Sequence, residues 1–283
     1  MFIPAGRNRT GVIAVVFWRG AGRDKGRVQM NEGFDLRGEV AIVTGGSQGL
    51  GKEMAKALAQ NGATVVLASR NLEKLKAVAQ EIHQAGGKAE AICCDISKFA
   101  DVQNLVGRVI GSFSKIDILI NNAGMNVPPK PLVDFPEEDW QRIIDTNLKG
   151  TFYCCKAVCP EMIRRKKGRI INISSVAGSV GFPGMAPYGA AKAGIIQMTK
   201  VLALELAEYN ITVNAIAPGF FDTPLRDNIR NNKKLVDWTL ERTPLRRCGL
   251  PKELTGLAVL LSSGASSYIT GQTISIDGGW TVW

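Results

Sequence analysis

The chain has 283 residues, 45% hydrophobic and 21% charged, with a mean hydropathy close to zero, which excludes a disordered, collagenous or low-complexity protein. Its longest apolar run, residues 11–18, is far shorter than the roughly 20 residues of a spanning helix, so we expect no membrane partner. Half of the net charge of +10 lies in residues 1–29, and the rest is spread widely without the interleaved aromatic residues that stack bases, so we expect no nucleic-acid partner.

Residues 1–29 differ in composition from the rest of the chain. They are rich in arginine and glycine, nearly free of acids, and contain neither a serine nor a small-residue cleavage site. We therefore expect a disordered basic extension followed by a domain over 30–283. The alternative is a start codon assigned too far upstream, with Met30 as the true start.

From residue 38 onward, short apolar runs alternate with segments of helical length. The runs predict strands at 40–44, 64–68, 89–93, 116–120, 169–173, 211–216 and 273–276. The helices expected between them cover 52–60, 72–84, 102–112, one long helix from 136 to about 168, 188–207 and 254–261. This alternation predicts a single doubly wound α/β domain of Rossmann type, with a parallel sheet of about seven strands and helices on both faces. The polar stretch 219–249 interrupts the rhythm and is expected to form a lid over a site.

The cysteines and the single histidine suggest no metal or redox chemistry. Six cysteines include two adjacent pairs, which do not resemble a disulfide framework, and His83 alone cannot complete a Cys/His metal cluster. We expect reduced cysteines, no metal, an exposed His83 and a cytoplasmic protein.

A glycine-rich loop at residues 44–51, TGGSQGLG, follows the first predicted strand and opens the first helix. Glycines allow a tight turn and a close approach to a pyrophosphate, whose charge the helix N-terminus stabilises. The spacing of Gly45, Gly49 and Gly51 differs from the usual GxGxxG pattern, so the loop alone predicts phosphate binding rather than a particular cofactor.

Tyr188 and Lys192 are four residues apart on a predicted helix and therefore share one face. An ammonium beside a phenol favours the phenolate, so this pair suits acid–base chemistry near neutral pH. A packed tyrosine with a snorkelling lysine is the alternative. Ser175 favours the first interpretation, because it follows a strand at the sheet edge where ligands bind.

Together these motifs resemble the short-chain dehydrogenase/reductase family over residues 35–283. The resemblance rests on TGxxxGxG at 44–51, NNAG at 121–124, Asn147, Ser175, Tyr188-xxx-Lys192 and Pro218-Gly219. It implies that Tyr188 transfers a proton to or from the substrate oxygen and that Ser175 hydrogen-bonds this oxygen. It further implies that Lys192 holds the nicotinamide ribose and depresses the pKa of Tyr188, and that Asn147 anchors a water.

The resemblance also implies a dinucleotide site and a homotetramer. Asp95 is expected at the adenine, Asn122 and Ala123 at the adenosine ribose, and Thr223 at the carboxamide. The tail, with Trp280 and Trp283, is expected at a subunit interface. The full set of expected cofactor contacts is Gly45, Ser47, Gln48, Gly49, Leu50, Gly51, Ser69, Arg70, Asp95, Ile96, Asn122, Ala123, Gly124, Tyr188, Lys192, Pro218, Gly219, Phe221 and Thr223.

The cofactor is expected to be NADP(H), with NAD(H) as the alternative. About 20 residues beyond the glycine loop, where an acid would bind the NAD ribose, stands the neutral Ser69, and the following Arg70 can bind a 2′-phosphate. Gln48 stands where some NADP-preferring relatives carry a second base, which leaves the preference incomplete.

The predicted function is the interconversion of a secondary alcohol and a ketone. Within the family, residues 135–140 and 242–247 are most similar to the gluconate 5-dehydrogenase type, which favours a sugar acid or another small polar substrate. Lys130 is the single base in 125–131, which weakens recognition of a carboxylate. One alternative is a 3-oxoacyl-acyl-carrier-protein reductase, whose acidic partner would suit the basic segment 164–169. A catalytically silent dinucleotide-binding sensor or scaffold is the other.

Overall fold

Seven parallel strands form the central sheet in the computed structural model, which describes residues 32–226 and 233–282. The strand order is β3-β2-β1-β4-β5-β6-β7. The strands are β1 (Val40–Thr44), β2 (Thr64–Ser69), β3 (Lys88–Cys93), β4 (Ile118–Asn121), β5 (Gly168–Ile173), β6 (Ile211–Pro218) and β7 (Thr273–Ile276). The expected doubly wound α/β fold is confirmed. The basic extension at 1–29 lies outside the described residues.

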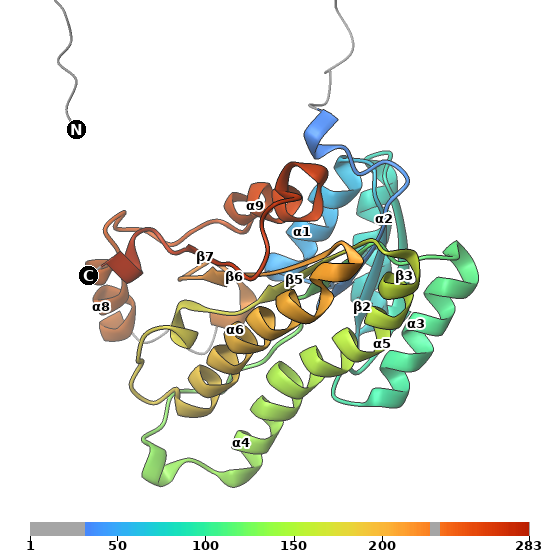
Figure 1. The fold of residues 1–283 in the computed structure, drawn as a ribbon. Coiled ribbons are helices and arrows are strands. Elements are labelled where there is room, and N and C mark those ends of the chain that lie inside the picture. The colour runs from blue at the N-terminus through green and yellow to red at the C-terminus, as the bar shows by residue number, and fades with distance from the viewer. Residues whose placement is uncertain (1–31, 227–232, 283) are drawn as a thin grey trace, which may run out of the picture.

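Helices cover both faces of the sheet (Figure 1). One face packs against α1 (Gly49–Gln60), α2 (Leu72–Gln84) and α9 (Thr255–Ser262). The other packs against α3 (Phe99–Phe113), α5 (Gly150–Arg165) and α6 (Ala186–Leu206). The central strands β1 and β4 are fully buried because both of their faces meet helices. Their side chains therefore form one continuous core with the two helical layers.

The order of the strands fixes where a ligand can bind. The chain runs outward from β1 to β3 and then returns to place β4 on the other side of β1. The connections after β1 and β4 therefore leave in opposite directions and open a crevice at the carboxyl edge of the sheet. The glycine loop follows β1, and NNAG spans the end of β4.

Two helical segments differ from the expectation. The long helix expected from 136 to 168 is divided into α4 (Glu137–Ile143), a π-helical turn (Ile144–Lys149) and α5. The expected lid region contains a further helix, α8 (Lys233–Arg242), in a stretch for which no helix was expected. In addition, Phe221 pairs with Gly249, which joins the two ends of this region at the sheet edge.

Candidate active site

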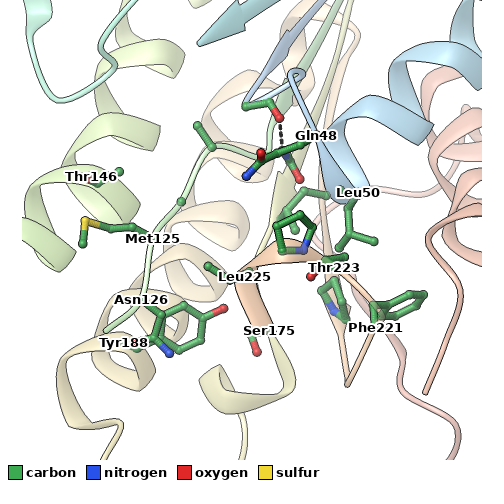
Figure 2. Close-up of a pocket in the computed structure, with 18 of the residues that line it drawn as sticks. Gln48, Leu50, Met125, Asn126, Thr146, Ser175, Tyr188, Phe221, Thr223 and Leu225 are labelled. Atoms are coloured by element: carbon green, nitrogen blue, oxygen red, sulfur yellow. Dashed lines mark hydrogen bonds between the residues drawn. The ribbon is translucent and has the colours of Figure 1, made fainter. Parts of the chain in front are cut away.

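A cavity of about 1020 Å³ opens at the carboxyl edge of the sheet and runs from the glycine loop to Tyr188. The residues expected from the sequence line it, with two exceptions, Gly51 and Asn147. Figure 2 shows Tyr188 and Ser175 on one side of this space and Thr223 and Phe221 across from them. Motifs that are far apart in the sequence therefore meet in a single pocket.

The glycine loop is locked onto the end of β4 by Asn122. The Asn122 amide nitrogen donates to the carbonyl oxygens of Thr44 (3.0 Å) and Gly45 (3.3 Å). The Thr44 hydroxyl accepts from the backbone nitrogens of Asn122 (3.0 Å) and Ala123 (3.1 Å). A Cβ at Gly45, where φ is +67°, would lie 2.7 Å from the Asn122 amide, and one at Gly51 would also collide with it. Gly51 thus makes room for Asn122 beside the loop, although it does not itself line the pocket.

Two basic residues that lie close together in sequence line the end of the pocket that is farthest from Tyr188. Ser69 ends β2, Arg70 follows it, and both line the cavity. Lys74, in the first turns of α2, also lines the cavity, and its ammonium donates to the Gln48 side chain at 3.2 Å. Lys74 was not among the residues expected from the sequence, although its position four residues after Arg70 was a usable signal. A second base therefore stands beside Gln48 although position 48 itself is neutral.

Asp95 and Ile96 line the same end of the cavity after β3. The Asp95 carboxylate accepts hydrogen bonds from the Ser97 nitrogen (3.1 Å) and hydroxyl (2.8 Å). These bonds fix the turn after β3, so Asp95 contributes to the wall of the pocket as a rigid element.

Tyr188 and Lys192 lie buried on α6, beside the end of β5 that carries Ser175. Their exposed fractions are 8% and 4%, and the Lys192 ammonium lies 5.6 Å from the centre of the Tyr188 ring. Lys192 donates to the carbonyl oxygen of Ile173 at 2.7 Å, and the Ser174 hydroxyl donates to the carbonyl oxygen of Lys192. These bonds tie α6 to β5 and hold the three side chains at the cavity.

Burial dominates the titration of both side chains. It raises the pKa of Tyr188 above its ordinary value, against a smaller lowering by a hydrogen bond with Ser175. Burial also lowers the pKa of Lys192 to about 8. The expected depression of the Tyr188 pKa by Lys192 is therefore absent from this structure, because desolvation of the phenolate outweighs the other influences. Tyr188 remains a proton donor at neutral pH.

Asn147 lies in the π-helical turn and is fully buried. Its amide donates to the Met125 carbonyl at 2.9 Å and accepts from the Met125 nitrogen at 2.8 Å. A Cβ at Gly124 would lie 3.2 Å from the Asn147 side-chain oxygen and 3.7 Å from the Lys192 ammonium. Asn147 thus fixes the segment after β4 next to Lys192, and it acts from behind the cavity wall.

The segment after β6 closes over the glycine loop. The Gly219 nitrogen donates to the Ile276 carbonyl at 2.8 Å, and Phe221 and Thr223 are both buried. A Cβ at Gly49 would lie 3.5 Å from the Thr223 side chain. The two segments therefore lie close together at the middle of the cavity.

The tail does not present Trp280 for a partner to cover. Trp280 is 3% exposed and packs within its own chain against Phe182, Phe220 and Trp238, while Trp283 lies outside the described residues. The contact among these aromatic residues could not be predicted from the sequence because they come from four separate segments. Trp280 is therefore covered within its own chain, and the expected position of the tail at a subunit interface stays a prediction.

Other expectations concern residues outside the pocket or at its edge. All six cysteines are free, and burial raises the pKa values of Cys94, Cys155 and Cys159. His83 is exposed, as expected, and its ring bonds the backbone of Ala89. Across residues 32–226 and 233–282, no group of three potential metal ligands occurs. Over the same residues, none of the helices is both long and apolar enough to cross a membrane.

Known proteins match this arrangement over most of the chain. A 3-oxoacyl-acyl-carrier-protein reductase of Thermotoga maritima is 40% identical over 247 residues, which cover 87% of this chain and 99% of the relative. The structure of a gluconate 5-dehydrogenase from Burkholderia cenocepacia, in complex with NADP and tartrate, is 37% identical with a TM-score of 0.86. The alignment covers 89% of this chain and 98% of that one.

A third relative has a different substrate and cofactor. It is the structure of a 7α-hydroxysteroid dehydrogenase complexed with NADH and 7-oxo glycochenodeoxycholic acid, 35% identical with a TM-score of 0.84, covering 88% of this chain and 96% of that one. Residues 39–234 match the family described as short chain dehydrogenase. The chain therefore belongs to the short-chain dehydrogenase/reductase family and is an oxidoreductase that acts on CH–OH donors.

Proposed function

We propose that the protein interconverts a secondary alcohol and a ketone with NADP(H) as its cofactor. The observation that carries the proposal is the convergence of Ser175, Tyr188 and Lys192 at one end of a cavity whose other end is the glycine loop. A dinucleotide-binding module without catalysis would need none of these three side chains. The silent sensor or scaffold therefore has less support than the enzyme.

The three side chains divide the acid–base work. In ketone reduction the Tyr188 hydroxyl donates its proton to the substrate oxygen, and in alcohol oxidation it takes a proton from it. The Ser175 hydroxyl orients this oxygen, and Lys192 places an ammonium close to the same point. The nicotinamide ring, when bound, accepts or supplies the hydride. Burial keeps Tyr188 protonated, which suits the reductive direction.

The cavity between β1 and α2 fits a dinucleotide phosphate. Gly45 and Gly49 both line the cavity, and the first backbone nitrogens of α1 have no side-chain cap. Arg70 and Lys74 line the pocket beyond this loop and supply two cations for a 2′-phosphate. Lys74 thus supplies the second base that position 48 lacks.

The two specific substrates suggested by similarity receive less support from the described residues. Lys130 is paired with Asp139 at 3.5 Å and does not line the cavity, so it does not recognise a sugar-acid carboxylate there. Three bases of the segment expected to meet an acidic carrier protein are paired with acids of the same chain. Arg164 pairs with Glu161, Arg165 with Asp117, and Lys167 with Glu39.

We also propose a homotetramer and a cytoplasmic location. The family resemblance supports the first. Six free cysteines in a chain of this size are typical of a reducing compartment and support the second.

The proposal is tested by following NADPH absorbance with purified protein and a panel of ketones, sugar acids and acyl thioesters. We expect ketone-dependent oxidation of NADPH in the wild type and its loss in Tyr188→Phe. Tight NADPH binding without turnover of any panel member in either direction would contradict the enzymatic function and favour the sensor.

A further inference from the structure

Four aromatic side chains form a wall at the Tyr188 end of the cavity. Phe182 follows β5, Phe220 follows β6, Trp238 lies on α8, and Trp280 lies in the tail. The ring centres of Phe182 and Phe220 are 5.8 Å apart, and those of Phe182 and Trp238 are 6.3 Å apart. Phe182, Phe220 and Trp238 line the same cavity as Tyr188. The Met185 nitrogen, just before α6, donates to the Phe182 carbonyl at 3.2 Å, which places the wall near the start of the helix that carries Tyr188.

Trp280 holds this aromatic wall together from behind. It stacks on Phe182 with ring centres 5.3 Å apart and an interplanar angle of 16°, and it lies 4.9 Å from Phe220 and 5.3 Å from Trp238. The Arg242 guanidinium lies over both Trp238 and Trp280, at 5.5 and 5.4 Å. The wall is therefore formed before any substrate arrives.

The tail that carries Trp280 is itself fixed by hydrogen bonds. The Asp277 carboxylate accepts from the Gly279 nitrogen at 2.9 Å, from the Thr281 nitrogen at 3.0 Å and from the Thr281 hydroxyl at 2.6 Å. A short turn thus places the buried indole against the wall, which makes Trp280 a positioning residue.

The remaining surface around Tyr188 is mainly apolar as well. The charged residues that line the described part of the cavity are Arg70, Glu73, Lys74 and Asp95 at the glycine-loop end, and Lys192 next to Tyr188. Asn126 lies beside Tyr188 (Figure 2), and the other side chains on this part of the cavity are mainly apolar: Met125, Val127, Pro129, Pro183, Met185, Phe221, Leu225 and Leu235. A carboxylate or a row of hydroxyls here would lose hydration without gaining partners from these side chains.

We propose that the substrate is a ketone or secondary alcohol whose skeleton beyond the reacting carbon is an apolar ring, aromatic or alicyclic. The ring would lie against Phe182, Phe220 and Trp238 while the oxygen meets Tyr188 and Ser175. This inference rests on the proposed function and narrows its substrate class.

The test compares two methyl ketones with full-length enzyme and saturating NADPH. Phenylacetone carries an apolar ring, and levulinate carries a carboxylate on a short chain. We expect kcat/KM for phenylacetone to exceed that for levulinate at least tenfold. Equal values or the reverse order would overturn the inference and leave the proposed oxidoreductase function intact. Turnover of neither ketone, nor of any other carbonyl compound, would overturn both.

A binding measurement tests contact between the ring and the aromatic wall without any turnover. Phenylacetone is titrated into the NADP⁺-loaded enzyme, where ketone and oxidised cofactor cannot react, and tryptophan fluorescence is followed. We expect quenching that saturates in the wild type and in Trp140→Phe, whose exposed indole lies on α4 away from the cavity. Retained quenching in Trp238→Phe of the same amplitude as in the wild type would overturn the placement of the ring.

Variants at position 182 test the polarity of the wall. In Phe182→Arg a guanidinium can still stack on Trp280 but brings a charge to the cavity. We expect kcat/KM for phenylacetone to fall at least tenfold and that for levulinate to rise, while Phe182→Leu keeps the wild-type preference. An unchanged preference in a folded Phe182→Arg variant would overturn the inference. For Trp280→Phe we expect a higher KM for phenylacetone, with kcat and the KM for NADPH retained.

Discussion

The buried pair Tyr188 and Lys192 shows how one environment moves two side chains in opposite directions. Desolvation penalises whichever form is charged, so it raises the pKa of the phenol and lowers that of the ammonium to about 8. Tyr188 is therefore a proton donor, and it lies beside Lys192, whose ammonium titrates close to physiological pH. Such perturbed values are typical of reacting groups.

Replacing Tyr188 by phenylalanine should remove the proton donor and little else. We expect turnover to fall by at least about 10², the usual scale for a lost general acid or base. The affinity for NADP(H) should stay within a few-fold of the wild type, because the glycine loop and the end of β2, which we propose as the main cofactor contacts, are unchanged. Steady-state kinetics and cofactor titration check both values, and turnover preserved in this variant would contradict the assigned role.

Lys192 should destabilise the folded chain at neutral pH. Its folded pKa of about 8 lies below the 10.5 of an unperturbed lysine, so the unfolded state binds more protons between these values. The penalty is fully present below pH 8 and disappears as pH rises toward 10.5. At about 1.4 kcal/mol per pKa unit it amounts to roughly 3 kcal/mol, offset by about 1 kcal/mol for the bond to Ile173.

Lys192→Met should therefore raise the free energy of unfolding at pH 7 by about 2 kcal/mol while abolishing activity. At pH 10 the difference from the wild type should shrink to less than half of that. Urea unfolding of both proteins at the two pH values measures it. A variant less stable than the wild type at pH 7 would show that the hydrogen bond to Ile173 outweighs desolvation.

At the scale of elements, the inner strands could be predicted closely from the sequence because they are buried on both faces and read as apolar runs, whereas the edge strands β3 and β7 are partly exposed. The strands at 40–44 and 273–276 agree residue for residue with β1 and β7. The π-helical turn at Ile144–Lys149 could not be predicted, since its sequence continues a helical pattern. Its role is to place Asn147 where it bonds to Met125, a contact visible only in the structure. Helix α8 was missed because only Thr239 of its residues is buried.

The site likewise has a part that could be predicted from the sequence and a part that could not. The glycine loop, NNAG and Tyr188-xxx-Lys192 are contiguous motifs, so their chemistry could be predicted from local spacing. The aromatic wall joins residues 182, 220, 238 and 280, which only the sheet topology brings together. No local sequence pattern relates those positions.

We expect the residues between the end of β2 and the first turns of α2 to determine the choice between NADP(H) and NAD(H). We expect NADP(H) to be preferred over NAD(H) at least tenfold in kcat/KM, because Arg70 and Lys74 offer two cations and Ser69 offers no repelling carboxylate. Ser69→Asp with Arg70→Leu should abolish or reverse the preference. Lys74→Met should weaken NADP(H) alone, since NAD(H) has no 2′-phosphate. Equal losses for both cofactors would show that Lys74 acts structurally.

At the scale of the molecule, several large apolar side chains face outward from a finished core. Phe152 on α5 is 44% exposed, Leu204 on α6 is 82% exposed, and Tyr268 is fully exposed. Helices α5 and α6 lie on the same face of the sheet (Figure 1). Scattered apolar residues are normal on surfaces, but a leucine and a phenylalanine on neighbouring long helices favour coverage by another subunit.

We therefore expect four chains to associate in solution through a surface that includes α5 and α6. Light scattering at micromolar concentration should give about four times the chain mass of 30.5 kDa. Phe152→Glu with Leu204→Glu should lower this mass, because burying two carboxylates without partners is unfavourable. Lys88→Glu is the control. It changes an exposed charge at the start of the edge strand β3, outside helices α5 and α6, and should leave the mass unchanged. A wild-type protein that remains monomeric would contradict the assembly, and a tetramer indifferent to the double substitution would place its interface elsewhere.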